Sequence, residues 1–510
     1  MLSYGHPLQD AHRMTAPAPA KAAPDAARRD AVAGRLAAHL PVHAVLTAAE
    51  DLRPYECDGL SAYRREPLVA VLPADEGEAA AILRVARETG TPVVARGSGT
   101  GLSGGALPLE DGILLSLGKF NRILGVDPLA RTCRALPGVR NAQITEAVAP
   151  HGLYYAPDPS SQIACSIGGN VAENSGGVHC LKYGLTVHNI QKVRALTIEG
   201  DAVEFGSDAL DAPGYDLLAL ATGSEGLLAV ITEVTVKLLP KPQVAQVVMA
   251  SFPDVEKAGD AVAAVIGAGI VPAGLEMMDR MATAAVEDYV HAGYDLTAEA
   301  ILLCESDGTP EEVAEEIAKI TEVMRAAGST AFAVSSSEAE RLKFWSGRKA
   351  AFPAVGRISP DYYCIDGSIP RGTLAKVLRR IEELSAEYGL RCANVFHAGD
   401  GNLHPLILYD ANVPGELEKT EEYAGAILEL CIEVGGTITG EHGVGVEKIN
   451  QMCVQFRPAE IAQFHAVKAA FDPPGLLNPG KAVPTLNRCA EYGRMRVSRG
   501  QLPFPDLPRF

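Results

Sequence analysis

Two glycine-flanked segments in the C-terminal half carry the residues best suited to chemistry. His397 and His404 bracket the bend HAGDGNLHP, and Glu441 and His442 stand side by side in TGEHGVG. A strand, a turn and a returning strand would bring the two histidines of the bend together, which an extended run could not do. Two neutral imidazoles and one carboxylate form a three-ligand site with open positions, as in catalytic metal sites. The pattern predicts a divalent metal, zinc, manganese or iron, on His397, His404 and Glu441.

Four further residues are candidates for roles around this metal. His442 adjoins a ligand without being needed as one, and an imidazole with an ordinary pKa near ~6.5 can accept a proton, so we expect it to be the base. Asn402 and Asp400 would support the ligands or bind substrate. Arg348, in FWSGRKAAF, offers the cation that an anionic substrate requires. The alternative for the histidines is a buried position in the core with ordinary hydrogen-bond partners, and the alternative for Arg348 is a position on the surface.

A glycine-rich stretch in the N-terminal half predicts an anion site. The segment RGSGTGLSGG, residues 96–105, has five glycines, so its N–H groups can close around a pyrophosphate. It contains GxGxxG, but the chain continues into a turn and a strand-like run and not into a helix, which weakens a nicotinamide-type Rossmann site. The alternative is a turn without a ligand. The polar neighbours Arg96, Ser98, Thr100 and Ser103 favour phosphate.

Two more segments of low charge accompany this anion site. Residues 157–177, PDPSSQIACSIGGNVAENSGG, and residues 222–226, TGSEG, are rich in glycine, serine and asparagine. Loops of this composition can wrap a large polar cofactor with backbone and hydroxyl donors, although plain turns share it. Together the three segments predict a nucleotide cofactor.

Periodicity indicates the elements that position these segments. A strand at 68–72 and a helix at 76–88 precede the anion site, and strands at 113–117 and 123–126 with a helix at 142–149 follow it. This pattern predicts an α+β domain with mixed strands. From residue 247, strands alternate with predicted helices at 255–266, 311–327, 374–388 and 416–434. That alternation is typical of an antiparallel sheet with helices on one face.

Composition limits the functional class. The 510 residues carry a formal net charge of −18 that is spread along the chain, which argues against nucleic acid as a partner. Ten cysteines include no CxxC pair, so we expect no iron–sulfur cluster or zinc ribbon in this chain, and reduced thiols in a cytoplasmic setting. No apolar run approaches the ~20 residues of a transmembrane segment.

Six segments, taken in order, resemble those of the FAD-linked oxidases of the vanillyl-alcohol oxidase type. They are the cradle (residues 96–105), residues 157–177, TGSEG, HAGDGNLHP, TGEHGVG and the closing DPPGLLNPGK. The resemblance covers roughly residues 68–481. It implies an α+β fold with a two-subdomain FAD-binding domain, an antiparallel, ferredoxin-like substrate domain and a helical C-terminal segment that returns to the flavin. We expect an arm and first helix at 1–50, the FAD-binding domain at 51–241, the substrate domain at 242–434, the returning segment at 435–485 and a tail at 486–510.

The resemblance also implies which residues hold FAD. The cradle would bind the pyrophosphate through Arg96, Gly97, Ser98, Gly99, Thr100, Gly101 and Gly104. The rest of the cofactor would meet Pro157, Ser161, Gly168, Asn170, Gly177, Glu225, Gly226, Ile231, Asn478 and Lys481. Relatives with covalent flavin often carry a histidine in the cradle, and none stands here. We therefore expect non-covalent FAD.

Within the family, the chain resembles the members that oxidise small 2-hydroxy acids to 2-oxo acids. There the residues matching His397, His404 and Glu441 bind the metal, and the residue matching His442 is the base. Members that act on D-2-hydroxyglutarate place a lysine about where Cys364 stands, so the departure favours a monocarboxylate such as glycolate or D-lactate. A D-2-hydroxyglutarate or D-lactate dehydrogenase remains the near alternative. A non-catalytic FAD-holding scaffold and an ether-forming transferase are the alternatives of other classes.

The resemblance further implies an assembly. Electrons from the flavin would leave to a quinone, a soluble acceptor or a partner subunit with iron–sulfur clusters, and the resemblance favours the partner. We expect the chain to be the catalytic subunit of a complex in the cytoplasm, which a partner could hold at the inner face of the membrane.

Overall fold

The glycine-rich cradle begins at the end of β3, a strand of a small sheet near the N-terminus. The computed structural model describes residues 26–209 and 214–485, so the expected tail at 486–510 and most of the N-terminal arm lie outside the described residues. The small sheet has the strand order β1-β2-β4-β3, in which β3 and β2 both run parallel to β4. Its strands are β1 (Val45–Leu46), β2 (Val69–Val71), β3 (Val93–Arg96) and β4 (Ile113–Ser116).

Helices α1 (Ala26–Ala37) and α3 (Glu76–Thr89) bury apolar residues against this sheet, and the short α2 (Ala49–Leu52) precedes β2. Local signals determine where α3 begins and ends. The Asp75 side chain accepts from the N–H of Glu78 at its start, and Gly90 ends it in the left-handed region with φ of 62°. The helix predicted at 76–88 is thus confirmed within one residue.

A second, antiparallel sheet supplies the rest of the N-terminal half. Its strands, in spatial order, are β5 (Ile123–Asp127), β6 (Thr132–Ala135), β10 (Val230–Lys237), β8 (Ile190–Leu196) and β9 (Ala202–Gly206). Helices α4 (Asn141–Val148) and α5 (Ile167–Glu173) pack on it. Shorter elements connect these parts: β7 (Leu153–Tyr154) paired with β11 (Leu239–Pro240), α6 (Cys180–Tyr183), α7 (Thr186–Asn189) and α8 (Leu217–Ala221).

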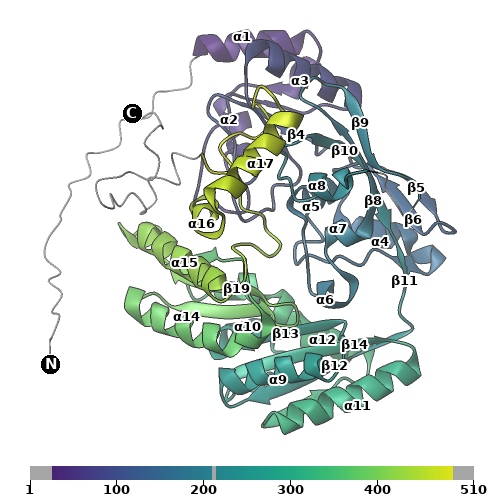
Figure 1. The fold of residues 1–510 in the computed structure, drawn as a ribbon, viewed down its shortest axis with the longest axis vertical. Coiled ribbons are helices and arrows are strands. Elements are labelled where there is room, and N and C mark those ends of the chain that lie inside the picture. The colour runs from purple at the N-terminus through teal and green to yellow at the C-terminus, as the bar shows by residue number, and fades with distance from the viewer. Residues whose placement is uncertain (1–25, 210–213, 486–510) are drawn as a thin grey trace, which may run out of the picture.

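The third sheet is antiparallel throughout and forms the lower half of the molecule in Figure 1. Its main path runs β15 (Ala331–Val334), β12 (Val244–Phe252), β14 (Ala300–Gly308), β13 (Gly274–Asp279), β18 (Cys392–His397), β19 (Asn402–Tyr409) and β16 (Asp361–Cys364), and β17 (Gly367–Ser368) also pairs with β19. The antiparallel sheet expected for this region is confirmed.

Helices cover both faces of this third sheet, so the expectation of helices on one face is wrong. One apolar core joins the sheet to α9 (Val255–Gly267), α11 (Pro310–Ala326), α14 (Leu374–Tyr388) and α15 (Glu416–Glu433). A second core on the opposite face includes α10 (Arg280–Val290), α12 (Glu338–Lys349) and α13 (Ala351–Val355). The interior strand β14 is buried from Ala300 to Asp307, and its apolar residues 300–304 point alternately into the cores on the two faces of the sheet.

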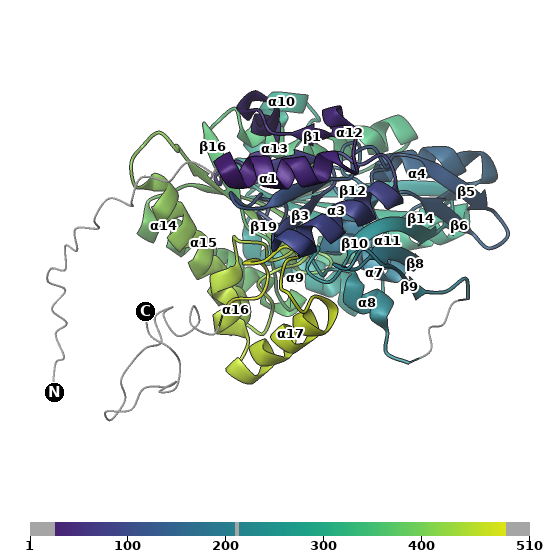
Figure 2. The same ribbon diagram turned by 90° about the horizontal axis from the view of Figure 1, so that it is seen from above.

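The chain ends by returning to the first sheet. Helices α16 (Ile449–Gln455) and α17 (Pro458–Phe471) are yellow in both ribbon views; they lie between α15 and the N-terminal elements in Figure 1 and along one side of the molecule in Figure 2. Leu477 then forms a parallel bridge with Val93 of β3, with Val93 N donating to Leu476 O and Asn478 N donating to Val93 O, both at 2.8 Å. Residues 476–478 therefore extend the sheet that carries the cradle.

Two sequence expectations concern membrane-spanning helices and the oxidation state of the cysteines. Within the described residues, no helix combines the length and the apolar character that crossing a membrane would require. Eight described cysteines carry free thiols, but Cys453 is disulfide-bonded, so the expectation of reduced thiols is wrong at that position.

Candidate active site

A cavity of about 560 Å³ opens where the cradle, the 157–177 loop and the edge of the third sheet meet. Twelve of the predicted cofactor residues line it: Arg96, Gly97, Ser98, Gly99, Thr100, Gly101, Ser161, Gly168, Asn170, Glu225, Gly226 and Ile231. His404, Glu441 and His442 line the same cavity. The two groups of residues that the sequence singled out therefore share one space.

Close packing explains why the cradle is built from glycine. A Cβ atom at Gly97 would lie 2.1 Å from Ser166 Oγ, the atom that accepts the N–H of Ser98. A Cβ atom at Gly99 would lie 2.2 Å from Arg96 Nη2, and Gly99 has a φ of 70°. The Arg96 side chain folds back over the loop and donates to Cys57 O at 2.6 Å. The cradle is thus a preformed backbone surface with one fixed cation.

Five predicted cofactor residues do not line the cavity: Gly104, Pro157, Gly177, Asn478 and Lys481. Asn478 and Lys481 bind the cradle from behind. Asn478 Nδ2 donates to Gly105 O at 3.0 Å and to Glu225 O at 2.7 Å, and Lys481 Nζ donates to Gly105 O at 2.9 Å. These two residues therefore hold the backbone of the cradle and of the neighbouring loop.

The predicted metal ligands come together at the β18–β19 hairpin. His397 ends β18 and His404 lies in β19, with ring centroids 5.0 Å apart. Glu441 Oε1 lies 3.1 Å from His397 Nε2 and 3.3 Å from His404 Nε2. Both ring nitrogens of His404 are buried and make no hydrogen bond to the described residues. A buried imidazole whose nitrogens make no hydrogen bond, beside a carboxylate, is a donor set suited to a divalent cation.

A buried acid orients the first of these ligands. Glu276 of β13 accepts from His397 Nδ1 at 2.8 Å and from Arg348 Nε at 2.7 Å. Burial would lower the pKa of His397, but Glu276 and Glu441 together raise it well above its ordinary value. Burial would raise the pKa of Glu441, but the charges of its histidine neighbours, His397 first, lower it to about 2. Glu441 is therefore a carboxylate at neutral pH.

Arg348 and Asn402 lie behind the cavity wall. Arg348 is only 2% exposed, and α12 directs it toward Glu276 in the sheet, whereas the next residue, Lys349, lines the cavity. Asn402 is buried in β19, and its Oδ1 has no hydrogen-bond partner in the described part of the chain. Arg348 is therefore linked to the predicted metal ligand His397 through Glu276. The neighbouring Lys349 is a cation that lines the cavity.

His442 faces the cavity with a neutral ring. Its ring stacks on that of His404 at 4.9 Å, with 8° between the planes. Burial lowers the pKa of His442 to about 4 and outweighs the opposing effect of Asp366. The ring is therefore neutral at neutral pH, which is the form that a general base must have before it takes a proton.

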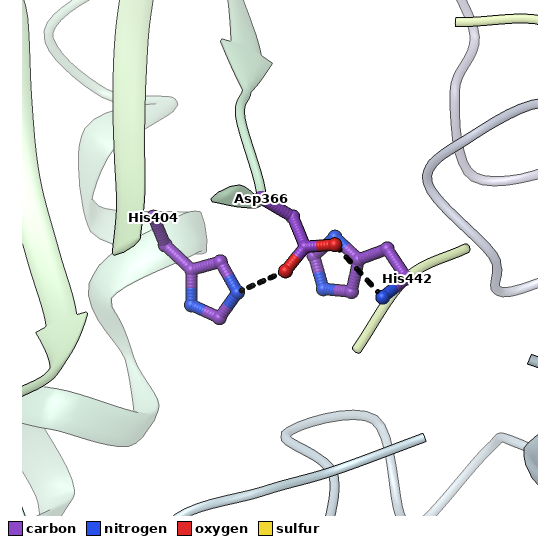
Figure 3. A group of neighbouring side chains, drawn as sticks. All are labelled: Asp366, His404 and His442. Atoms are coloured by element: carbon purple, nitrogen blue, oxygen red, sulfur yellow. Dashed lines mark hydrogen bonds and ion pairs between the residues drawn. The ribbon is translucent and has the colours of Figure 1, made fainter. Parts of the chain in front are cut away.

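Asp366 is a site residue that the sequence analysis missed. It lies between His404 and His442 in Figure 3, with Oδ1 3.7 Å from His404 Nε2. Its oxygens accept the backbone N–H groups of Gly440 at 3.0 Å, Glu441 at 3.1 Å and His442 at 2.9 Å. Asp366 thereby fixes the backbone of the loop that presents Glu441 and His442.

Lys448 completes this arrangement. Its Nζ donates to Asp366 Oδ2 at 2.8 Å, and both side chains are fully buried. Burial would raise the pKa of Asp366, but Lys448 lowers it well below its ordinary value. Asp366, His404 and His442 also offer atoms within 4.8 Å of one another. Because five donors already occupy the oxygens of Asp366, the group of His397, His404 and Glu441 is the better cation site.

Comparisons with known proteins agree with the FAD-linked architecture. Residues 67–206 match the family described as "FAD binding domain", and residues 241–482 match "FAD linked oxidases, C-terminal domain". The solved structure of 4-ethylphenol oxidase from Gulosibacter chungangensis superposes with a TM-score of 0.77 at 17% identity, over 91% of this chain and 98% of that one. This likeness confirms the expected fold class.

Two curated relatives span nearly the same length as this chain. "Glycolate oxidase subunit GlcD" of Escherichia coli strain K12 is 63% identical over 482 residues, which are 94% of this chain and 97% of that protein. "D-lactate dehydrogenase" of Archaeoglobus fulgidus is 35% identical over 82% of this chain and 92% of that protein. The chain therefore belongs to the FAD-linked oxidases and is a flavin-dependent oxidoreductase with the fold of the vanillyl-alcohol oxidase type.

Proposed function

We propose that this protein oxidises a small 2-hydroxy acid, glycolate or D-lactate, to the 2-oxo acid with non-covalent FAD, as the catalytic subunit of a glycolate oxidase complex. One observation carries the proposal: a neutral histidine, His442, faces the same cavity as a cradle for FAD and a three-residue cation site. The two relatives whose names specify glycolate and D-lactate agree with this substrate class.

The residues of the chain supply the proton chemistry. When bound, FAD accepts the α-hydrogen as hydride, and a divalent ion on His397, His404 and Glu441 would acidify the substrate hydroxyl. His442 Nε2 lies 3.9 Å from Glu441 Oε1, so it is in position to take the hydroxyl proton while the C–O bond becomes a carbonyl. Asp366 keeps the ring in place by holding the backbone N–H of His442.

The cavity wall favours a substrate with one carboxylate. Lys349 is available to one carboxylate at the cavity, while Cys364 is buried in β16 and places no second cation there. D-2-hydroxyglutarate, which has a second carboxylate, is therefore the weaker candidate.

The electrons need a route out of the protein. No CxxC pair occurs in the sequence, so we propose transfer to a partner subunit that carries iron–sulfur clusters. The relative from Escherichia coli is named as a subunit, which supports an assembly. We further propose that this assembly works in the cytoplasm, at the inner face of the membrane when the partner binds there.

Anaerobic titration of the purified flavoprotein tests the proposal. Glycolate or D-lactate should bleach the yellow flavin faster than D-2-hydroxyglutarate, and metal analysis should find about one divalent ion per chain. A His404→Ala variant should lose the ion while keeping FAD, whereas His188→Ala, which changes a histidine outside the ligand group, should keep both. A flavin that none of the three acids bleaches would identify a scaffold or a transferase instead.

A further inference from the structure

We infer that Glu173 is a neutral carboxylic acid that donates its O–H group to the bound flavin and thereby raises the reduction potential of the flavin. This inference rests on FAD binding and not on the identity of the substrate. It concerns a cavity residue that the proton chemistry of His442 does not use.

Glu173 is enclosed between the cradle and the loop that presents the candidate base. It is the last residue of α5 and lines the cavity. A Cβ atom at Gly443 would lie 2.1 Å from Glu173 Oε2, and one at Gly105 would lie 2.6 Å from Glu173 Oε1. The absence of side chains at Gly443 and Gly105 therefore makes room for this carboxyl group.

One oxygen of the Glu173 carboxyl group, Oε2, lacks a donor that would stabilise a negative charge in the described part of the chain. Its Oε2 is out of reach of solvent and has no hydrogen-bond partner among the described residues. Its neighbour Glu225, which also lines the cavity, accepts the N–H groups of Val444 and Gly445 at 2.7 Å each. Burying an unpaired carboxylate costs far more than burying the neutral acid. Of the two acids, Glu225 keeps the charge and Glu173 keeps the proton.

The charges that face Glu173 agree with this assignment. Burial is the largest effect, and with the nearby charges of Glu225 and Asp58 it raises the pKa of Glu173 well above its ordinary value. Lys448 and Lys481 oppose the rise but are outweighed. For Glu225, burial is again the largest effect and raises the pKa, while the two backbone N–H donors, Val444 and Gly445, oppose that rise.

A neutral acid on the wall of this cavity needs an acceptor. A buried O–H group without a partner is costly, and the described residues give Oε2 none. The flavin ring carries carbonyl oxygens and ring nitrogens, which accept hydrogen bonds and become more electron-rich on reduction. A hydrogen bond to an acceptor that gains negative charge becomes stronger, so it favours the reduced flavin.

The test is the reduction potential of the reconstituted flavoprotein, measured against a redox dye with a chemical reductant and no hydroxy acid. In Glu173→Leu the ratio of reduced to oxidised flavin should fall about tenfold at a fixed potential, which is about 30 mV for a two-electron couple. Glu173→Gln should lose less, because its amide N–H₂ group can still donate.

Glu447→Leu is the matched control. Glu447 is also a buried acid with an unpartnered oxygen, and burial raises its pKa to about 8, but it does not line the cavity. Its removal should leave the flavin potential unchanged. An unchanged potential in Glu173→Leu, or an equal fall in both leucine variants, would overturn the inference.

A second measurement decides the case where Glu173→Leu fails to hold FAD. The infrared difference spectrum between oxidised and reduced wild-type protein should contain a protonated-carboxyl C=O band that shifts on reduction, and Glu173→Gln should lack it. A wild-type spectrum without that band would refute a neutral Glu173. Because neither measurement uses a hydroxy acid, a wrong substrate assignment would not affect them.

Discussion

The candidate base and the candidate ligands differ in how their charge is set. His442 is neutral because burial outweighs the attraction of Asp366, whereas Glu441 is charged because histidines surround it. The chain thus places a proton acceptor beside a fixed negative charge within one loop. That difference, at adjacent positions, allows the two side chains to take different roles.

Removing the base should stop flavin reduction without releasing the flavin. His442→Asn should slow anaerobic reduction by glycolate or D-lactate by about 10²- to 10⁴-fold, the usual contribution of a general base. Stopped-flow absorbance of the flavin measures the rate. His465→Asn is the control, because His465 lies 3.0 Å from Pro484 O and does not line the cavity. Rapid reduction in His442→Asn would remove this residue from the mechanism.

Sequence patterns predicted the site residues that lie close together along the chain. They missed the site residues that reach the site only through tertiary contacts. His397 and His404 could be paired because a hairpin returns after a glycine bend, and the structure brings both beside Glu441. Glu276 meets this group from β13, and Asp366 meets it from the link between β16 and β17, so no local spacing indicated them. One signal was available for Asp366: an acid within a buried, strand-like run is unusual and needs a partner.

The loop at 439–443 is an element held by one buried ion pair. Asp366 accepts its successive N–H groups, and Lys448 donates to Asp366 Oδ2 and to Gly443 O, both at 2.8 Å. The loop therefore depends on both charges, because removing Lys448 would leave a carboxylate buried without its counterion.

Lys448→Met should destabilise the protein by about 3–5 kcal/mol, the cost of breaking a buried pair at one partner. Thermal unfolding measures the loss, and slower flavin reduction should accompany it because the loop carries His442. Lys319→Met is the matched control: Lys319 and Glu315 form an exposed pair on α11, and water screens such a pair, so its loss should barely change the stability. Equal losses in the two variants would contradict the role given to the buried pair.

The element that returns from the C-terminus should control FAD retention. Asn478→Ala removes the two hydrogen bonds to Gly105 O and Glu225 O, and Asn478 has a φ of 43° that alanine tolerates less well. FAD should therefore bind about tenfold more weakly, since about 1.4 kcal/mol corresponds to tenfold. Fluorescence titration of the apoprotein measures the affinity. Asn412→Ala, in an exposed turn, should bind FAD as the wild type does.

Among the secondary-structure elements, the sequence predicted the helix boundaries best. It did not predict that helices cover both faces of the third sheet. The helix predicted at 374–388 is α14 itself, because an apolar stripe and Gly389 determine it locally. Helix α10 begins directly after β13, and Asp279 both ends the strand and caps the helix. With no loop between them, the sequence contains no turn signal that separates the two elements.

At the scale of the molecule, charged side chains join the FAD-binding half to the third sheet. His179 contacts Asp158 Oδ2 at 2.8 Å and Glu305 Oε1 of β14 at 3.2 Å. Three residues further along, Lys182 Nζ donates to Asp307 Oδ1 at 2.6 Å, and Tyr183 donates to the same carboxylate. These contacts hold α6 against β14 and so keep the cradle facing the cation site.

This junction should weaken in alkaline solution. Burial would lower the pKa of His179, but Asp158 and Glu305 raise it well above its ordinary value. A pKa raised in the folded state gives stability that is complete below about 6.5 and is lost as pH rises through the folded value, at about 1.4 kcal/mol per unit of difference. His179→Gln should therefore flatten the fall in melting temperature above pH 6.5. A variant as sensitive to pH as the wild type would contradict this origin.

The bridge between Val93 and Leu477 has a consequence for synthesis of the chain. Strand β3, which leads into the cradle, pairs at its outer edge with a residue that is synthesised almost four hundred positions later. A nascent polypeptide therefore cannot complete its nucleotide pocket until residues 476–478 have been synthesised. Cofactor loading should be a late event, and prematurely terminated chains should emerge colourless.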